Sequence, residues 1–575
     1  MWAFAVAGGV IGLGLVWVIV TGLMVWSQLE AERADVAAAK AALIAGNDHE
    51  AAQIAARLKR RADSARAHTS GPAWWVAAHV PWAGAPLASV RELTGAVDAL
   101  ANDALTPAVK AGTTMAPSKV LVGHGRLDLS LIAESTQPLS QAASAVSPVA
   151  HSLATGHQHT WLGAVDAKRA LLARQVSDLS RTLDNATRAS RLLPSMLGAD
   201  GVRRYFVAFE TPAEARGLGG LPGSYGILTA DHGRVHFSRF GSDTDITSTA
   251  SVSFGSNWQA RYADTFHANS IFVNSTASPH FPYAANIWLS MWEKQYGQHL
   301  DGAIATDPTA LGYLLNAAGP VTLSDGQQLT GDNAASFLEN GVYAKFPSLD
   351  PTQVAARKAY LVQAARDIAS HITDAASANP SGLLTALTEA AGQHRLLAYS
   401  AHASQEQQLE TSPMAGIVTD TTQPYAGLVI NNAAGSKLDY YLDRSLTYER
   451  STCDATTATV TVKLTNTAPA QGLPPYVTIT EGLGHVPPGT NVDDVALYLT
   501  RGADLSGVTL DGKRQYMQSG DERGHPVVSF TVLLKPGQSR TLVYKIAEPR
   551  AAGPVMVPVQ PLMRPMSVAV RSPTC

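Results

Sequence analysis

The side chains best placed for chemistry stand beside a run of glycines in the middle of the chain. Glu214 and Arg216 come first. Four glycines follow within seven residues: Gly217, Gly219, Gly220 and Gly223. Such a segment exposes backbone N–H groups and lets a ligand approach the main chain, and an adjacent arginine suits a phosphate or a carboxylate. The pattern predicts an anion site at Arg216 with Gly219 and Gly220 as binding residues. A glycine-rich turn between two strands is the alternative.

Several common catalytic and metal-binding patterns are missing from the sequence. It contains no HExxH, GxSxG or P-loop pattern, and two cysteines far apart cannot form a zinc-finger or CxxC pattern. The formal net charge is −3, so no global basic field would recruit nucleic acid. We therefore expect no nucleic-acid partner.

The beginning of the chain has the properties of a membrane anchor. Residues 1–26 carry no charged side chain, and the first charged residue is Glu30. A membrane-spanning helix needs roughly 20 mostly apolar residues, and tryptophans such as Trp2 and Trp26 favour the headgroup regions at its ends. A cleaved signal peptide is the alternative, but its apolar core is usually about 7–15 residues long and follows a basic stretch. The sequence predicts an uncleaved single span over residues 1–27.

The charges and the cysteines favour an exported body. Cytoplasmic flanks are rich in Lys and Arg, whereas the flank after the predicted span opens with more acidic than basic residues. The two cysteines, Cys453 and Cys575, form an even count, which in an exported chain permits one disulfide. Two unrelated buried thiols are the alternative. We expect a single-pass protein of the cell membrane with its main body outside the cytoplasm.

Residues 28–196 are predicted to form a helical stalk or bundle, because Ala, Leu and Val recur there at three- and four-residue steps. One segment, GPAWWVAAHVPWAG, crowds three tryptophans, Trp74, Trp75 and Trp82, among prolines and glycines. It could lie on the membrane surface, as aromatic belts do, or it could cap the bundle. The sequence leaves both alternatives open.

The rest of the chain is predicted to hold two further domains. Strand-like and helix-like segments mix over residues 197–425, which argues for one α/β domain. Residues 426–575 contain alternating strands separated by turn signals such as Asp511-Gly512, a pattern typical of an immunoglobulin-like β-sandwich. The predicted fold class is therefore a multidomain α+β protein.

Several segments of the chain resemble the actinobacterial domain-of-unknown-function family 4012. They are EARGLGGLPGSYGIL, SPHFP, DGAIATDPTALGYLLNAAGPV, SKLDYYLDRS and NTAPAQGLPPYV. The resemblance covers nearly the whole chain. It implies a membrane-anchored envelope protein and no established activity.

The order of elements in residues 197–425 is also similar to that of the LytR-CpsA-Psr phosphotransferases. Those enzymes move a glycopolymer from a polyprenyl pyrophosphate carrier onto the cell wall. PAEAR, ending at Arg216, sits where that family has Gly-Asp-x-Arg, and LLNAAGPV resembles its Gly-Gly-Val segment. The helix that begins near Asp350 would supply Arg357, and Lys345 would be a cation just before it. The resemblance implies catalytic roles for Arg216 and Arg357 and a binding role for Lys345, all at one pyrophosphate.

The chain also departs from that family. GSYG replaces an Arg-Ser-Asp whose Asp helps to hold magnesium, and Val354 replaces an arginine of the helix motif. Either Glu214, Asp243 and Asp245 rebuild a magnesium site, or the fold keeps polyprenyl-phosphate binding without transfer. A plain loop at the two aspartates and a solvated helix face at Arg357 and Arg366 are the alternatives.

Two functions of different classes follow from these observations. The first is binding, with or without transfer, of a polyprenyl-phosphate-linked glycopolymer outside the membrane. Magnesium is the implied cofactor of the transfer. The second is a non-enzymatic scaffold that docks other envelope proteins. The incomplete set of acidic residues near Arg216 favours the scaffold, because phosphoryl transfer depends on positioning and on neutralising the developing charge. The expected partners are the lipid bilayer, the polyprenyl pyrophosphate glycopolymer and other envelope proteins.

Overall fold

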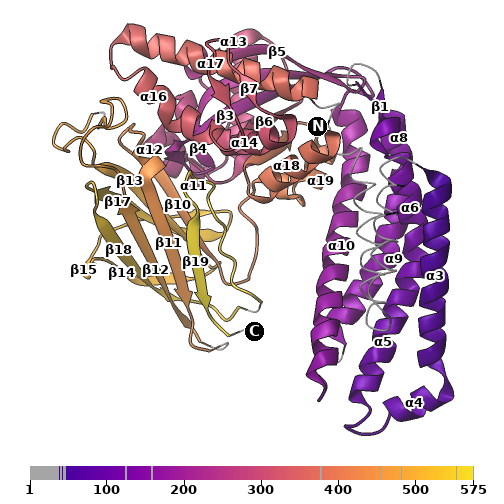
Figure 1. Ribbon diagram of the computed structural model, residues 1–575. Helices are drawn as coiled ribbons and strands as arrows, with labels where there is room; N and C mark the ends of the chain where they lie inside the picture. The colour runs from indigo at the N-terminus through magenta and orange to yellow at the C-terminus, as the bar shows by residue number, and fades with distance from the viewer. Residues whose placement is uncertain are drawn as a thin grey trace. The chain divides into compact units, whose positions relative to one another are not determined.

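A computed structural model describes residues 47–573 except 123–125, 157–158, 376–378, 453–454, 481 and 552, together with Ala38 and Ala42. The chain divides into two compact units (Figure 1). The first comprises residues up to Arg203 with the short segments Ala230–His236 and Asp374–Thr385, and the second comprises the remainder. The structure confirms a mixed α+β protein with several sheets.

The first unit is a bundle of long helices. Its principal helices are α3 (Asp48–Ser70), α5 (Ala85–Ala99), α6 (Leu105–Thr114), α9 (Thr136–Thr155) and α10 (Gly163–Met196). Shorter elements join them: α4 (Pro72–Ala78), α7 (Pro117–Val120), α8 (Leu129–Glu134), the π-helical turn η1 (Leu100–Ala104) and the two-residue strands β1 (Leu121–Val122) and β2 (Arg126–Leu127). Apolar residues at helical spacing give the long helices a buried stripe, as with Ile54, Leu58 and Ala62 of α3.

Part of the second unit is built on a mixed five-stranded sheet with the order β5-β4-β3-β6-β9. Its strands are β3 (Arg203–Arg216), β4 (Gly219–Asp231), β5 (Arg234–Ser242), β6 (Gly302–Thr306) and β9 (Leu396–Ser400). β3 runs parallel to β6, and β6 runs antiparallel to β9. Trp288 of the buried helix α13 (Phe281–Tyr296) packs against Phe206 of β3, with ring centroids 5.5 Å apart.

Helices and short turns complete this part of the second unit. They include α14 (Pro308–Ala318), α16 (Val342–Lys345), α17 (Pro351–Ala375), α19 (Ala403–Leu409) and the π-helical turn η5 (Phe337–Gly341), while α18 (Pro380–Gly392) belongs to the second unit only from residue 386 onward. α14 begins at an Asp307 cap whose side chain accepts a hydrogen bond from the Ala310 amide, followed by a proline in the first turn. The small hairpin of β7 (Val321–Thr322) and β8 (Gln328–Leu329) follows α14.

The C-terminal part of the second unit is a two-sheet β-structure. One sheet contains β10 (Ala426–Asn432), β13 (Asn491–Leu499), β17 (His525–Leu534) and β16 (Gln518–Glu522). The other contains, in spatial order, β15 (Lys513–Arg514), β14 (Asp504–Leu510), β18 (Ser539–Ala547), β12 (Thr457–Asn466), β11 (Leu442–Glu449) and β19 (Met566–Arg571). Every second residue of β12 is buried, as its alternating sequence TATVTVKLTN predicts.

Two predictions fall on parts of the chain that the structure does not describe. Within the described ranges, no helix is both long and apolar enough to cross a membrane. The predicted anchor, residues 1–27, lies outside those ranges, as do Cys453 and Cys575 of the predicted disulfide. The strands that lead to the two cysteines are parallel neighbours, with Glu449 of β11 opposite Arg571 of β19. Cys453 follows Glu449 by the same number of positions as Cys575 follows Arg571, which is compatible with the predicted disulfide. The disulfide stays a prediction, because neither cysteine lies in the described ranges.

Candidate functional site

The glycine-rich segment forms the buried end of a long hairpin. Tyr205–Phe209 of β3 pair with β6, and β3 then continues to Arg216 before the chain turns back into β4. We call residues 210–221 the β3–β4 arm. All but Thr211 are buried, and Ala215 belongs to the hydrophobic core of the two-sheet β-structure. The arm therefore joins the five-stranded sheet to the core of the β-structure within the second unit.

Protein atoms fill the space beside the glycines of the arm. A Cβ atom on Gly217 would lie 2.2 Å from the carbonyl oxygen of Ala277, and one on Gly220 would lie 2.3 Å from the carbonyl carbon of Thr211. Gly219 has a φ of 155°, and its Cβ position faces Glu210 and Pro561. The glycines thus allow main chain to pack closely on main chain, which is the role of turn residues between two strands.

Arg216 is enclosed by hydrogen-bond acceptors of the protein itself. Its Nη1 donates to the carbonyl oxygens of Ala215 and Asn432 at 2.9 and 3.1 Å, and its Nη2 donates to Asn274 Oδ1 at 2.9 Å. The residue is 7 % exposed. Burial lowers the pKa of Arg216, and the charges of Glu214 and Asp439 act in the opposite direction. The guanidinium ties the arm to β10 and to the loop before α13.

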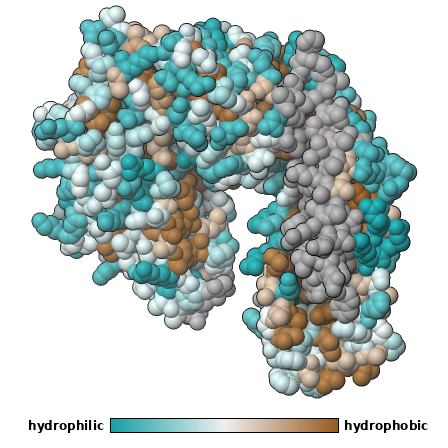
Figure 2. Space-filling view, in the orientation of Figure 1, coloured by the Kyte–Doolittle hydropathy of each residue, from teal (hydrophilic) through white to brown (hydrophobic). Residues whose placement is uncertain are grey.

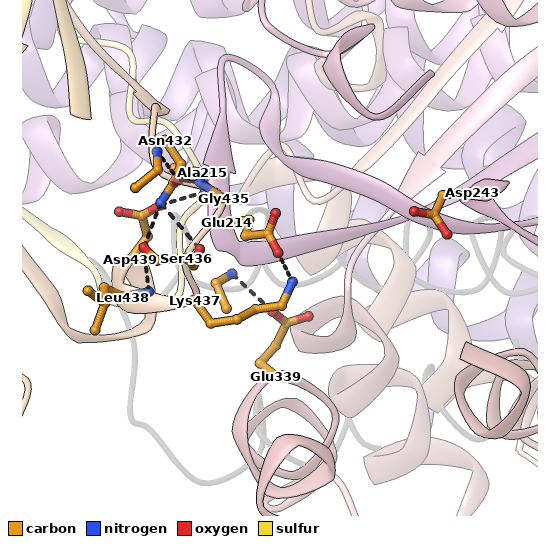
Figure 3. A network of polar contacts seen from close by, with 12 residues as sticks. Glu214, Ala215, Asp243, Glu339, Asn432, Gly435, Ser436, Lys437, Leu438 and Asp439 are labelled. Atoms are coloured by element: carbon orange, nitrogen blue, oxygen red, sulfur yellow. Dashed lines mark hydrogen bonds and ion pairs between the residues drawn. The ribbon is translucent and has the colours of Figure 1, made fainter. Parts of the chain in front are cut away.

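Glu214 forms a buried ion pair with Lys437, in the segment that follows β10 (Figure 3). The two side chains are 8 % and 5 % exposed, respectively. Burial acts to lower the pKa of Lys437, but the charge of Glu214, the neighbouring Tyr343 and Tyr476 and the contact with Glu214 together raise it, so the ammonium group stays charged. Glu339 of η5 lies beside this pair and accepts a hydrogen bond from the Ala213 amide at 2.9 Å. Burial raises the pKa of Glu339 to about 8.

Asp439 fixes the other side of the arm. Its carboxylate accepts hydrogen bonds from the Ala215 amide at 2.8 Å and from the side-chain amides of Asn432 and Asn491, both at 2.7 Å. The Ser436 hydroxyl and the carbonyl oxygen of the same residue accept two longer hydrogen bonds from Asn432 Nδ2. One buried carboxylate therefore connects the arm to strands β10 and β13.

Arg357 contacts the same cluster from α17. Its guanidinium lies 3.5 Å from the ring centroid of Tyr476 and 5.4 Å from that of Tyr343. The two tyrosine rings are stacked, and Lys437 Nζ lies 5.0 Å from the ring centroid of Tyr343. Arg357 is 1 % exposed, so it does not lie on a solvated helix face. Cation–π contacts hold it against aromatic rings.

The other predicted site residues lie apart from this cluster. Lys345 is half-exposed, forms an ion pair with Asp325 and lies 4.7 Å from the ring centroid of Tyr360. Asp243 accepts two hydrogen bonds of 2.7 Å from Lys358, while Asp245 accepts one from the Ser242 amide. Figure 3 shows Asp243 away from Glu214.

These positions do not fit the predicted magnesium site. Glu214 and Asp243 each face a lysine, and Asp245 caps a short turn. In the described part of the chain, no three His, Cys, Asp or Glu side chains gather where they could hold a metal ion. The structure also brings together only part of the predicted set of cations, because Arg357 lies in the cluster around Lys437 and Lys345 does not.

Lys437, Asp439 and Glu339 are the central residues that the sequence reasoning missed. Lys437 and Asp439 belong to SKLDYYLDRS, a segment that marked the family resemblance but received no role. The available signal was that the oppositely charged Lys437 and Asp439 stand two positions apart, directly before the apolar and aromatic residues 440–442. Such charges are buried only when they are paired.

Comparisons with known proteins match one part of the chain. Residues 200–343 match the model of a family described as protein of unknown function (DUF4012). No curated protein and no solved structure matches the chain. The matched segment contains the β3–β4 arm, Glu339 and Tyr343, whereas Lys437, Asp439 and Tyr476 lie beyond it. Residues 200–343 are thus similar to that family of unknown function.

Proposed function

We propose that this protein is a non-enzymatic scaffold or interaction protein of the cell envelope, anchored by residues 1–27 with its body outside the membrane. One observation carries the proposal. Glu214 and Arg216 of the β3–β4 arm are buried and paired with groups of the same chain, and Asp439 accepts a hydrogen bond from the arm's Ala215 amide. They act as an internal clasp, which we define as Glu214, Arg216, Glu339, Lys437 and Asp439.

A transferase site would need these groups in another arrangement. A pyrophosphate that bound Arg216 through Nη1 and Nη2 would displace Asn432 and Asn274 from these two nitrogens. That displacement would move the arm and expose the buried Glu214–Lys437 pair. Breaking a buried ion pair costs about 3–5 kcal/mol, which is comparable with the strength of the contacts that a phosphate would gain. The clasp therefore supports a structural role for Arg216.

The alternative function, binding or transfer of a polyprenyl-phosphate-linked glycopolymer, makes opposite predictions. The resemblance to LytR-CpsA-Psr enzymes suggested it through Arg216, Arg357 and Lys345. Arg357 is stacked on Tyr476, and Lys345 faces Asp325. A pyrophosphate that joined all three would have to replace these contacts as well.

Two variants of the full chain separate the functions. Glu214→Gln combined with Lys437→Met replaces the ion pair by a neutral pair and leaves Arg216 in place. If the protein is a scaffold, this double variant should restore the wild-type envelope phenotype to a deletion strain. In the same strain, the Arg216→Lys variant should impair the envelope phenotype only to the extent that it lowers the abundance of the protein. Purified full chain in nanodiscs, incubated with a polyprenyl pyrophosphate-linked glycan and magnesium, should release no polyprenyl product. Release that disappears in the Arg216→Lys variant at unchanged abundance would overturn the proposal.

A further inference from the structure

One end of the helical bundle carries an uncharged surface rich in tryptophan. It consists of α4, the turn 79–84 and the segment 159–162, and we call it the bundle tip. Trp82, Trp75 and Trp161 are 78 %, 51 % and 53 % exposed. The rings of Trp82 and Trp161 stack with centroids 5.8 Å apart, so the two segments form one surface. Figure 2 shows hydrophobic residues at the end of the bundle that carries α4.

The absence of charge sets the tip apart from the rest of the bundle. No Asp, Glu, Lys or Arg occurs between Arg66 and Arg91, or between Glu134 and Asp166, and the tip lies within these two stretches. α4 has no buried residue, although it contains two tryptophans and a valine. An exposed apolar surface of this kind marks a site of contact with a membrane or a partner.

The most exposed tryptophan of the tip, Trp82, has an unusual backbone conformation. Trp82 has a φ of 59°, a left-handed conformation that is unusual for a bulky residue. Such a backbone conformation persists only where the surrounding structure over-determines it. Here it accompanies a tryptophan with most of its side chain in solvent. The ring of Trp82 is therefore not part of the hydrophobic core of the bundle.

The chain before the bundle indicates that the surface in contact with the tip is a lipid bilayer. α3 starts at Asp48 and, at 23 residues, extends for about 35 Å toward the tip. The sequence predicts a helix before Gly46 and the apolar span before that helix. A helix before Gly46 that runs antiparallel to α3 would bring the end of the span back toward the tip. Tryptophan favours the headgroup region of a bilayer, and an uncharged surface enters it without the cost of burying a charge.

We propose that the bundle tip inserts Trp75, Trp82 and Trp161 into the headgroup region of the membrane that holds the N-terminal span. The bundle is then held at two points, by the span and by its own tip. This inference goes beyond the scaffold function and depends on different residues, so its test is independent of the clasp.

Tryptophan quenching in the full chain tests the insertion. The protein is placed in nanodiscs of phosphatidylcholine and phosphatidylglycerol, and the signal of the tip is the difference between the wild type and the triple variant Trp75→Phe, Trp82→Phe and Trp161→Phe. A nitroxide attached near the lipid headgroup should quench this difference signal, and aqueous iodide should not. Trp292→Phe is the matched control, since Trp292 is buried in the core of the second unit and its signal should respond to neither quencher. Far-ultraviolet circular dichroism verifies the helix content of the triple variant.

Two results would overturn the inference. Iodide quenching of the difference signal would mean that the tip stays in water. Protection from iodide without nitroxide quenching would mean that a protein surface, such as a second copy of the chain, covers the tip.

Discussion

Removal of Lys437 alone should destabilise the second unit strongly, because it leaves Glu214 buried without its partner. Lys437→Met keeps the length and apolar volume of the side chain and removes the charge. With the two side chains only 5 % and 8 % exposed, the expected loss is about 3–5 kcal/mol of unfolding free energy. The double variant Glu214→Gln, Lys437→Met should be within about 1 kcal/mol of the wild type, because a neutral pair needs no compensating charge.

A matched control distinguishes this loss from a general effect of removing a lysine. Lys345→Met breaks the ion pair with Asp325, whose partners are 41 % and 28 % exposed, and it should change the unfolding free energy by about 1 kcal/mol or less. Urea unfolding followed by the fluorescence of the buried Trp288 and Trp292 measures all three variants. Equal effects of Lys437→Met and Lys345→Met would refute the buried clasp and leave Glu214 available to a ligand.

Three further predictions follow from the same contacts. Burial raises the pKa of Glu339 to about 8, so the folded protein binds more protons than the unfolded chain between about pH 4.5 and pH 8 and loses stability as the pH rises through that range; urea unfolding of Glu339→Gln should show a flatter pH profile, and an unchanged slope would contradict the assignment. Gly220→Ala should lower the unfolding free energy by about 1–3 kcal/mol, because its Cβ would meet the carbonyl carbon of Thr211, whereas Gly484→Ala, with open space around it, should have little effect. The predicted disulfide should appear as one linked pair of cysteine peptides in non-reducing mass spectrometry of the exported protein; two free thiols would exclude it.

Local patterns in the sequence predict the elements of this fold better than they predict its site. The alternation in β12 and the apolar spacing of α3 depend on neighbours within a few positions, and the structure has a strand and a helix there. The clasp depends on distant pairs. Lys437 lies 223 residues after Glu214, and Asp439 lies 224 residues after Ala215. No periodicity within a segment carries information about such a pairing.

Arg216 shows how a site pattern can have a structural meaning. Glycines beside an arginine suit both a ligand and a close packing of main chain, and the types of residue are the same in both cases. The difference lies in what fills the space beside the glycines, which is main chain of Ala277 and Thr211. The tryptophan segment shows the converse. Its composition left membrane contact and capping of the bundle open, and the exposure of Trp82 favours contact with an outside partner.

Hydrogen exchange at the amides of Ala213 and Ala215 tests the central claim most directly. These amides donate to Glu339 and Asp439, so their exchange reports whether the arm stays closed. The full chain in nanodiscs is measured with and without a short-chain polyprenyl pyrophosphate and magnesium. A structural clasp predicts slow exchange at both amides and no change when the pyrophosphate is added. Fast exchange without ligand, or a change at these amides that follows the pyrophosphate concentration, would contradict the clasp and support a ligand site at Arg216.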